Sequence, residues 1–126
     1  MKKNSGKALP PHLQTGIEAE RLAEKYLRRE GLTTVVRNYR SRYGEIDLVL
    51  RDGNTLVFVE VRFRNNIRYG SAAESITRGK TEKIRKTAQF FLQENYRFAH
   101  LYSRFDVVAV SSSGDQPEIT WIRDAF

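Results

Sequence analysis

Two stretches with the residue content of β-strands, 45–51 and 55–64, are joined by a turn signal at Asp52-Gly53-Asn54. Both stretches are rich in β-branched and other apolar residues, which favour strands. Glycine beside aspartate or asparagine between two such runs is typical of a tight hairpin. We therefore expect two adjacent antiparallel strands, and this hairpin limits the chain to folds that are built on a sheet.

Each strand of this hairpin carries an acidic residue within an otherwise apolar run. Because side chains alternate along a strand, Asp47 and Glu60 should share one face, with Arg62 beside Glu60. The apolar side chains that should share the other face of the first strand are Ile46, Leu48 and Leu50. A Gly53-Asn54 turn places the two acids directly opposite each other, whereas an Asp52-Gly53 turn makes them diagonal neighbours, roughly 7–8 Å apart.

Two carboxylates so close together need something to offset their repulsion. At about 5 Å that repulsion costs roughly 3 kcal/mol at an effective dielectric constant of 20. A shared proton, a salt bridge to Arg62 or Arg64, or a bound divalent cation would each reduce it. Mg²⁺ suits the last case, because it takes carboxylate oxygens and keeps several waters, one of which is a candidate nucleophile. The alternative is that both acids only pair with arginines on a solvated face, and spacing alone leaves both interpretations open.

Size and charge narrow the class of protein. A chain of 126 residues predicts one domain, which we assign to residues 14–126 after a flexible basic tail at 1–13. The formal net charge of +7 favours nucleic acid as the partner, and the absence of cysteine excludes zinc sites built on thiolates. No stretch reaches the roughly 20 apolar residues that span a bilayer, and the N-terminus lacks the apolar part of a signal peptide. We therefore expect a cytoplasmic protein with no membrane contact.

Helical and strand patterns surround the hairpin. Thr15 and Glu18 fit a capping box that opens a helix ending at Gly31. The other expected elements are a strand at 32–36, a basic loop at 38–44, a flexible loop at 65–75, a helix from Thr77 to about Asn95, and strands at 104–110 and 118–122. A helical connection between the third and fourth strands makes those two parallel. The sequence therefore predicts an α/β protein with a mixed sheet flanked by helices.

Several linked motifs extend along most of the chain. They are Gly16-x3-Glu20-x2-Ala23, Asn38-Tyr39-Arg40, Gly44-Glu45-Ile46-Asp47-Leu48, Phe58-Val59-Glu60-Val61-Arg62-x-Arg64, Lys80 and Arg104-Phe105-Asp106-Val107-Val108. Through them residues 14–126 resemble the YraN-type family of uncharacterised bacterial proteins. That family is placed in the restriction-endonuclease-like (PD-(D/E)XK) superfamily, near the archaeal Holliday-junction resolvases.

The resemblance implies a three-layer fold with an αβββαβ core and a metal-dependent endonuclease site for DNA, with branched DNA as one candidate substrate. Asp47 and Glu60 would bind Mg²⁺ or Mn²⁺, and Glu20 would reach in from the first helix as a third ligand. Arg62 occupies the position where the superfamily usually carries lysine. Arginine stays protonated and cannot accept a proton, but it can orient a water or bind a phosphate. We therefore expect Asp47, Glu60 and Arg62 to form the catalytic set.

Basic residues around this set are candidates for contact with phosphates. They are Arg40, Arg42, Arg64, Arg68 and Lys80. Asp106, in an apolar strand, is expected to be a structural ion-pair partner of Arg104 rather than a metal ligand.

Two other functions remain open from the sequence. The first is a module of the same fold that binds nucleic acid without cutting it, which Arg62 favours. The second is a scaffold for another DNA-processing factor, in which the acids are merely salt-bridged.

Overall fold

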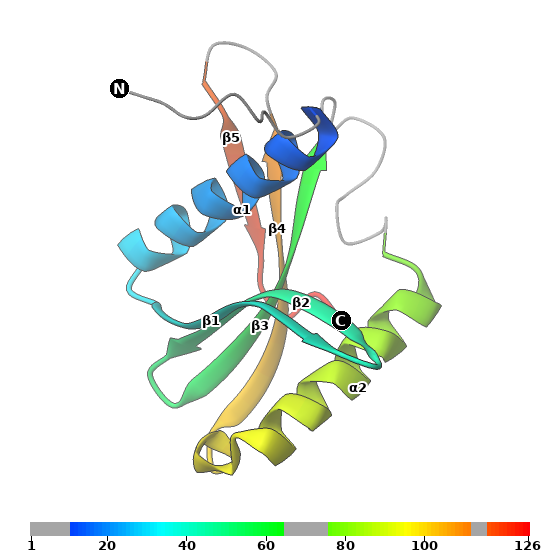
Figure 1. The fold of residues 1–126 in the computed structure, drawn as a ribbon. Coiled ribbons are helices and arrows are strands. Elements are labelled where there is room, and N and C mark those ends of the chain that lie inside the picture. The colour runs from blue at the N-terminus through cyan, green and yellow to red at the C-terminus, as the bar shows by residue number, and fades with distance from the viewer. Residues whose placement is uncertain (1–10, 65–75, 112–115) are drawn as a thin grey trace, which may run out of the picture.

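A five-stranded mixed sheet forms the centre of the molecule (Figure 1). The computed structural model describes residues 11–64, 76–111 and 116–126. Its elements are α1 (Pro11–Arg29), β1 (Thr33–Ser41), β2 (Gly44–Asp52), β3 (Thr55–Arg64), α2 (Arg78–Glu94), the short 3-10 helix η2 (Tyr96–Phe98), β4 (Tyr102–Ser111) and β5 (Glu118–Ile122). The strands lie in the order β1-β2-β3-β4-β5. Among the strand pairs of the described residues, β3 and β4 run parallel and the other pairs antiparallel, which confirms the predicted mixed sheet.

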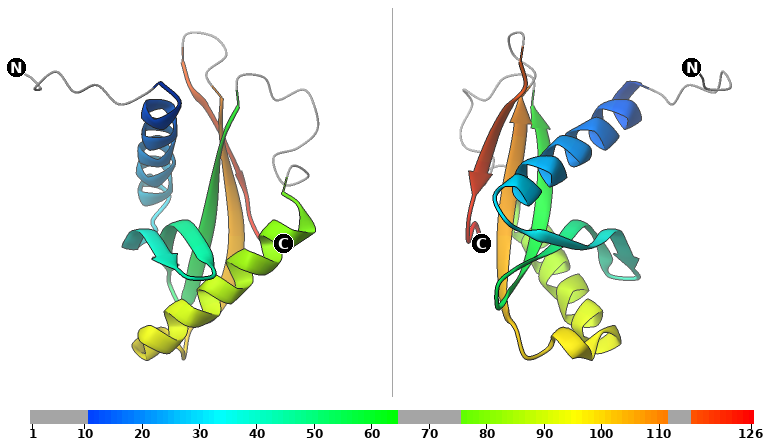
Figure 2. Two further views of the ribbon diagram at one scale, coloured as in Figure 1. Left: turned by 45° about the vertical axis from the view of Figure 1, so that its right-hand side comes forward. Right: turned by 90° about the vertical axis from the view of Figure 1, so that its left-hand side faces the viewer.

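The two helices cover opposite faces of this sheet, which gives three layers (Figure 2). Ala23 and Leu27 of α1 pack in one buried cluster with Val59. Ile84 and Phe91 of α2 pack in the other, which contains Phe58. Phe58 and Val59, which are neighbours on β3, therefore point to opposite faces of the sheet, as alternation along a strand requires. Neither α1 nor α2 combines the length and the apolar character needed to cross a membrane.

The hairpin between β2 and β3 adopts the first of the two registers that the sequence allows. Asp52 pairs with Thr55, so Gly53 and Asn54 form the turn. Gly53 has a φ of +60°, which glycine adopts readily because it has no Cβ. The predicted α2 is also confirmed, because Thr77 is its N-cap and accepts a hydrogen bond from the Lys80 backbone at 3.2 Å.

Two predicted boundaries are wrong. Helix α1 begins at Pro11, so Thr15 lies within the helix rather than at its start. Proline is favoured in the first turn, where its missing N–H would have no partner anyway. The predicted loop at 38–44 is largely strand, because β1 continues to Ser41. Pairing with β2 maintains β1 through a bulge after Thr34 and a positive φ of 50° at Asn38.

The structure tests the expected tail at 1–13 only in part and does not test the expected loop at 65–75. Residues 1–10 and 65–75 lie outside the described residues, and the last part of the expected tail, from Pro11, belongs to α1.

The β1–β2 hairpin curls away from the rest of the sheet (Figure 2). Regular pairing of β2 with β3 stops at Leu48 and Val59. Beyond that point Ile46 packs in the cluster on the α2 side, while Leu48 packs in the cluster on the α1 side. The prediction that these two residues share a face is therefore wrong, because simple alternation does not extend through a bend. Asp47 lies between them, at the point where β2 departs from β3.

Candidate functional site

The Asp47 carboxylate lies where β2 and β3 separate. Its Oδ2 accepts a hydrogen bond from the backbone N–H of Val61 at 2.9 Å. A side chain thus satisfies a strand N–H beyond the last regular pair of the hairpin. Continuing the register would set Asp47 across from Glu60, so the two predicted acids are neighbours on adjacent strands.

Glu60 is nearly buried, and its nearest cation comes from another layer of the fold. Its side chain is 8% exposed, and Lys80 Nζ lies 2.8 Å from Glu60 Oε2. Arg62 Nε is farther away, at 3.8 Å from the same oxygen. The Thr77 cap fixes the first turn of α2 and so places Lys80 over β3. Lys80, predicted only as a phosphate contact, is therefore the closest counter-ion of the acidic pair.

Glu20 reaches this region from α1, as the resemblance implied. Burial raises the pKa of its carboxyl, and the negative charges of Glu45 and Glu60 raise it further. Hydrogen bonds with Asn38 and Asp47 act in the opposite direction. Glu20 therefore belongs to the same acidic centre as Asp47 and Glu60.

The electrostatic surroundings of Asp47 confirm that the acids are crowded. Burial raises the pKa of Asp47 to about 7, and the charge of Glu60 contributes next. The Val61 N–H favours the ionised form, but the charges of Glu20 and Glu45 raise the pKa again. Of the arrangements expected to relieve this repulsion, an ion pair is present: Glu60 pairs with Lys80 and, at a longer distance, with Arg62.

The oxygen donors suit a hard divalent cation. Mg²⁺ is commonly held by one or two carboxylates together with waters and substrate phosphates, rather than by a cage of protein ligands. Asp47 and Glu60 can supply such a pair of carboxylates. Within the part of the chain that the structure describes, no group of three or more acidic, histidine or cysteine residues is placed to hold a metal ion. A third ligand from Glu20 would therefore require that its side chain moves.

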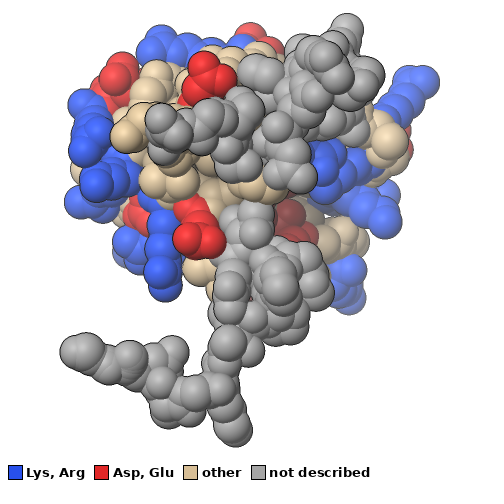
Figure 3. Space-filling view, turned by 90° about the horizontal axis from the view of Figure 1, so that it is seen from above, with Lys and Arg blue, Asp and Glu red and all other residues tan. Residues whose placement is uncertain are grey.

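The predicted phosphate contacts are dispersed around this centre. Arg40 lies on β1, exposed and 3.3 Å from Glu45, and Arg42 lies in the turn between β1 and β2. The Arg64 side chain and all of Arg68 fall outside the described residues. Seen from above, Lys and Arg side chains lie at the left and right of the view, and several acidic side chains lie between them (Figure 3).

A pocket of about 440 Å³ opens beside Glu20, between α1 and the first hairpin. It is lined by Ile17, Glu20, Arg21, Glu24, Arg37, Asn38 and Leu48. Sequence reasoning missed Arg37 and Asn38 at this position because it assigned no strand to residues beyond Val36. The Asn38-Tyr39-Arg40 motif was the available signal, since Asn38 is the hydrogen-bond partner of Glu20.

Comparisons with known proteins place these residues in a family context. The family model described as "Uncharacterised protein family UPF0102" matches residues 19–110, a span that contains Glu20, Asp47, Glu60 and Lys80. A UPF0102 protein of Saccharophagus degradans is 50% identical over 91% of this chain and 94% of its own length. UPF0102 proteins of Pseudomonas fluorescens and Vibrio cholerae are 46% and 47% identical, over 91% and 88% of this chain and 94% and 90% of their own lengths.

Proposed function

The chain belongs to the uncharacterised protein family UPF0102, and we propose that it is a metal-dependent endonuclease of restriction-endonuclease-like fold that hydrolyses phosphodiester bonds in DNA. The observation that carries this proposal is the meeting of acidic side chains from three elements. Glu20 of α1, Asp47 of β2 and Glu60 of β3 interact with one another. A fold gains no stability from gathering like charges in this way, so a functional reason is the more economical one.

The element order supports the superfamily part of the proposal. A helix, a three-stranded meander, a second helix and a parallel fourth strand form the observed core. This order matches the αβββαβ core that the sequence resemblance implies. Because one fold can host many functions, the activity is argued from the site rather than from this match.

The side chains divide the chemical work as follows. Asp47 and Glu60 would hold Mg²⁺ or Mn²⁺, with Glu20 assisting, and the bound cation would stabilise charge on the phosphate and lower the pKa of a water. Lys80 is close to Glu60, so its ammonium group can orient the attacking water. Arg62 keeps its proton and is suited to hold a phosphate oxygen. We therefore assign to Lys80 the role that the superfamily usually gives to the lysine at the Arg62 position.

The overall charge supports nucleic acid as the substrate. The net charge of +7 would attract a polyanion even though the centre of the site is acidic. A divalent cation would reverse the local charge of that centre and admit a phosphate. Affinity for DNA should accordingly fall with rising salt, since each phosphate contact releases counter-ions.

The direct test is cleavage of duplex, single-stranded and branched DNA with Mg²⁺ or Mn²⁺. The parent should cut at least one of these substrates, and Asp47→Asn should not. Lys80→Met should lower the rate by roughly 10²-fold, as expected when the attacking water is no longer held in position. Lys25→Met, at an exposed position of α1 outside both pockets, is the control and should cut like the parent.

Arg62→Lys should cut at least as well as the parent, because it restores the usual superfamily residue and keeps the positive charge. Absence of cleavage by the parent and by Arg62→Lys on every substrate, while both bind DNA and metal, would overturn the nuclease assignment.

A second candidate function is a nucleic-acid-binding module of the same fold. The Lys80–Glu60 ion pair favours it, because it already neutralises one of the two proposed metal ligands. The two functions differ in the effect of Asp47→Asn on DNA binding with Mg²⁺ present. A nuclease should lose its metal-dependent affinity, whereas a simple binding module should bind as before.

A further inference from the structure

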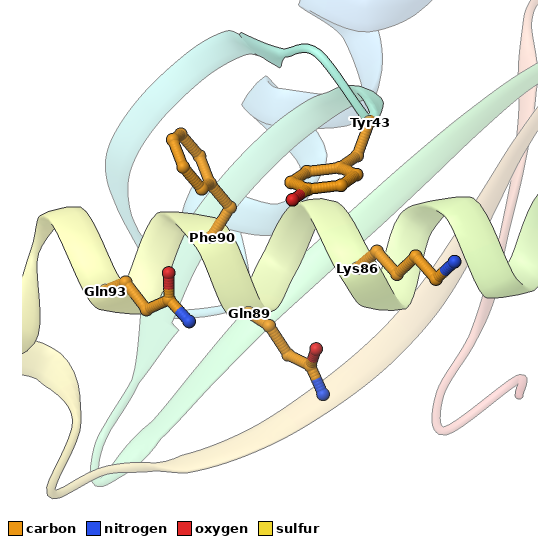
Figure 4. Close-up of a pocket in the computed structure, with 5 residues that line it drawn as sticks. All are labelled: Tyr43, Lys86, Gln89, Phe90 and Gln93. Atoms are coloured by element: carbon orange, nitrogen blue, oxygen red, sulfur yellow. The ribbon is translucent and has the colours of Figure 1, made fainter.

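A second pocket lies on α2 beside the turn between β1 and β2 (Figure 4). Its volume is about 320 Å³, and it is lined by Tyr43, Lys86, Gln89, Phe90 and Gln93. That volume falls at the lower end of the roughly 300–1,000 Å³ typical of small-molecule sites. None of the five residues belongs to the acidic centre, so the pocket is a separate feature of the surface.

Two aromatic rings from distant parts of the chain form one wall of this pocket. The Tyr43 and Phe90 rings meet edge to face, with centroids 5.9 Å apart. The Arg42 guanidinium lies over the Tyr43 ring, 5.2 Å from its centroid. Tyr43 is 37% exposed, so part of its ring is accessible from solvent. Exposed aromatic rings beside cations are the usual platform for stacking a nucleobase.

The polar side chains of the pocket suit the same ligand. Gln89 and Gln93 lie on one side of α2, and each amide offers both hydrogen-bond donors and an acceptor. Amides of this kind can pair with the edge of any nucleobase. Lys86 places a cation at the same surface, where it can contact the adjoining phosphate. Aromatic, amide and cationic groups are thus combined within one small volume.

A strip of lysines joins this pocket to the acidic centre. Lys80, Lys83 and Lys86 follow one another at three-residue spacing along α2, which gives a strip that turns slowly around the helix. Lys83 lies beside Gly44, at the turn between β1 and β2: a Cβ atom added to Gly44 would be 3.9 Å from the Lys83 Cβ. From Lys80 to Lys86 the helix rises about 9 Å. At about 3.4 Å per nucleotide along one strand, this distance spans roughly three nucleotides.

We propose that the pocket lined by Tyr43, Phe90 and Lys86 binds an unpaired nucleobase of the nucleic acid that is held at the acidic centre. The substrate class would then contain single-stranded nucleotides a few positions from the phosphate that is cut, as in an overhang, a flap or a branch. This inference rests on the proposed function for its account of the acidic centre. It also gives Arg42, predicted as a phosphate contact, a place at the edge of the pocket.

Binding to two matched DNAs tests the pocket without requiring cleavage. One is a blunt duplex, and the other is the same duplex with a short single-stranded thymidine overhang. Fluorescence anisotropy in EDTA measures affinity for each. Tyr43→Leu should weaken binding of the overhang DNA roughly 5- to 100-fold, the loss expected when a base–aromatic stack is removed. Its affinity for the blunt duplex should change little.

Tyr96→Leu is the matched control, because Tyr96 is a tyrosine on η2 that is 80% exposed and lies outside the pocket. It should bind both DNAs like the parent. Lys86→Gln, a change at an exposed position, should weaken overhang binding and reduce the slope of log affinity against log salt by about 1. If Tyr43→Leu were to unfold, Lys86→Gln would decide the question.

The outcomes separate this inference from the proposed function. Preference for the overhang that depends on Tyr43, in a parent that never cuts, would support the pocket and reject hydrolysis. A parent that cuts DNA while Tyr43→Leu and Lys86→Gln bind both DNAs like the parent would overturn the pocket. If both variants lost equal affinity for the overhang DNA and the blunt duplex, the inference would also be overturned. Such a result would show a general effect on DNA binding rather than recognition of an unpaired base.

Discussion

Two buried or partly buried aspartates lie in the same sheet, and their surroundings differ in almost every respect. Asp106 on β4 is fully buried and accepts hydrogen bonds from Arg104, from the Trp121 indole at 2.9 Å and from the Asp124 backbone at 2.9 Å. Arg104 donates to it through Nε at 2.9 Å and through Nη2 at 3.0 Å. Asp47 on β2 accepts one hydrogen bond from a backbone N–H and otherwise faces other carboxyl groups.

The contrast indicates that Asp106 stabilises the fold, whereas Asp47 destabilises it at neutral pH. Donors from three places in the chain compensate the charge of Asp106 and fix the C-terminal segment against β4. Asp47 lacks comparable compensation, and its pKa is raised to about 7. Functional sites commonly carry such unfavourable electrostatics, since the missing partner is the ligand. The same isosteric change at the two positions should therefore have opposite effects on stability.

Asp106→Asn should give the largest effect. The new side-chain NH2 group would face the N–H groups of Arg104 and Trp121, which also donate hydrogen bonds. The mostly buried guanidinium of Arg104 would lose its main partner. Breaking a buried ion pair in this way costs about 3–5 kcal/mol of unfolding free energy. Urea denaturation would measure the loss. A change below about 1 kcal/mol, within the usual range for surface positions, would remove Asp106 from its structural role.

Asp47→Asn should raise stability at neutral pH by about 1–2 kcal/mol, the opposite sign to Asp106→Asn. It removes a negative charge beside Glu20 and Glu60, while the Asn side-chain oxygen can still accept the Val61 N–H. Urea denaturation with EDTA present, so that no cation compensates the parent, would measure the gain. Destabilisation comparable to that of Asp106→Asn would show that both aspartates are structural.

The gain from Asp47→Asn should also depend on pH in a defined direction. In the folded chain the pKa of Asp47 is raised from its ordinary value of 3.8 to about 7. The folded state therefore holds this proton more tightly, so the parent loses stability as pH rises from about 4 to 7. The difference in the free energy of unfolding between Asp47→Asn and the parent should be small near pH 4. It should grow up to about pH 7 and then level off. A difference that does not vary with pH would contradict the raised pKa.

Lys80→Met should give the smallest effect of the series. It removes the closest counter-ion of Glu60, but the Lys80 side chain is 43% exposed, so solvent screens much of the interaction. We expect a loss of about 0.5–1 kcal/mol, near the upper end for exposed ion pairs. Lys83→Met, at an exposed position of the same helix, should change stability by less. Equal losses for the two variants would show that the Lys80–Glu60 pair contributes nothing specific.

Local patterns were sufficient to predict much of this molecule. The sequence allowed two registers for β2 and β3, and both of them make Asp47 and Glu60 neighbours; the Gly53-Asn54 turn is the one that forms. The pairing of Asp106 with Arg104 was also predictable, because residues two apart on a strand point to the same side. In both cases the interacting residues are close in sequence or joined by a short turn.

The remaining errors concern contacts between residues that are distant in sequence. The expected ion pair of Glu60 with Arg62 is present at 3.8 Å, but the closer pair, with Lys80 of α2, was not predicted. Strand alternation states which face a side chain occupies, not which helix will cover it. The bend in β2, which takes Ile46 to the opposite layer from Leu48, likewise depends on how the first hairpin curls away from the sheet. Tyr43 and Phe90 come together for the same reason.

The central claim is that the carboxylates around Asp47 are maintained for a divalent cation and a phosphate. The most direct measurement is the melting temperature of the parent, Asp47→Asn and Glu60→Gln with EDTA and with Mn²⁺ or Mg²⁺. A cation that binds only the folded chain stabilises it by about 2.7 kcal/mol when its concentration is 100 times the dissociation constant. We predict that the cation raises the melting temperature of the parent by several degrees and leaves both variants unchanged. Equal increases in all three proteins, or none in the parent, would contradict the account.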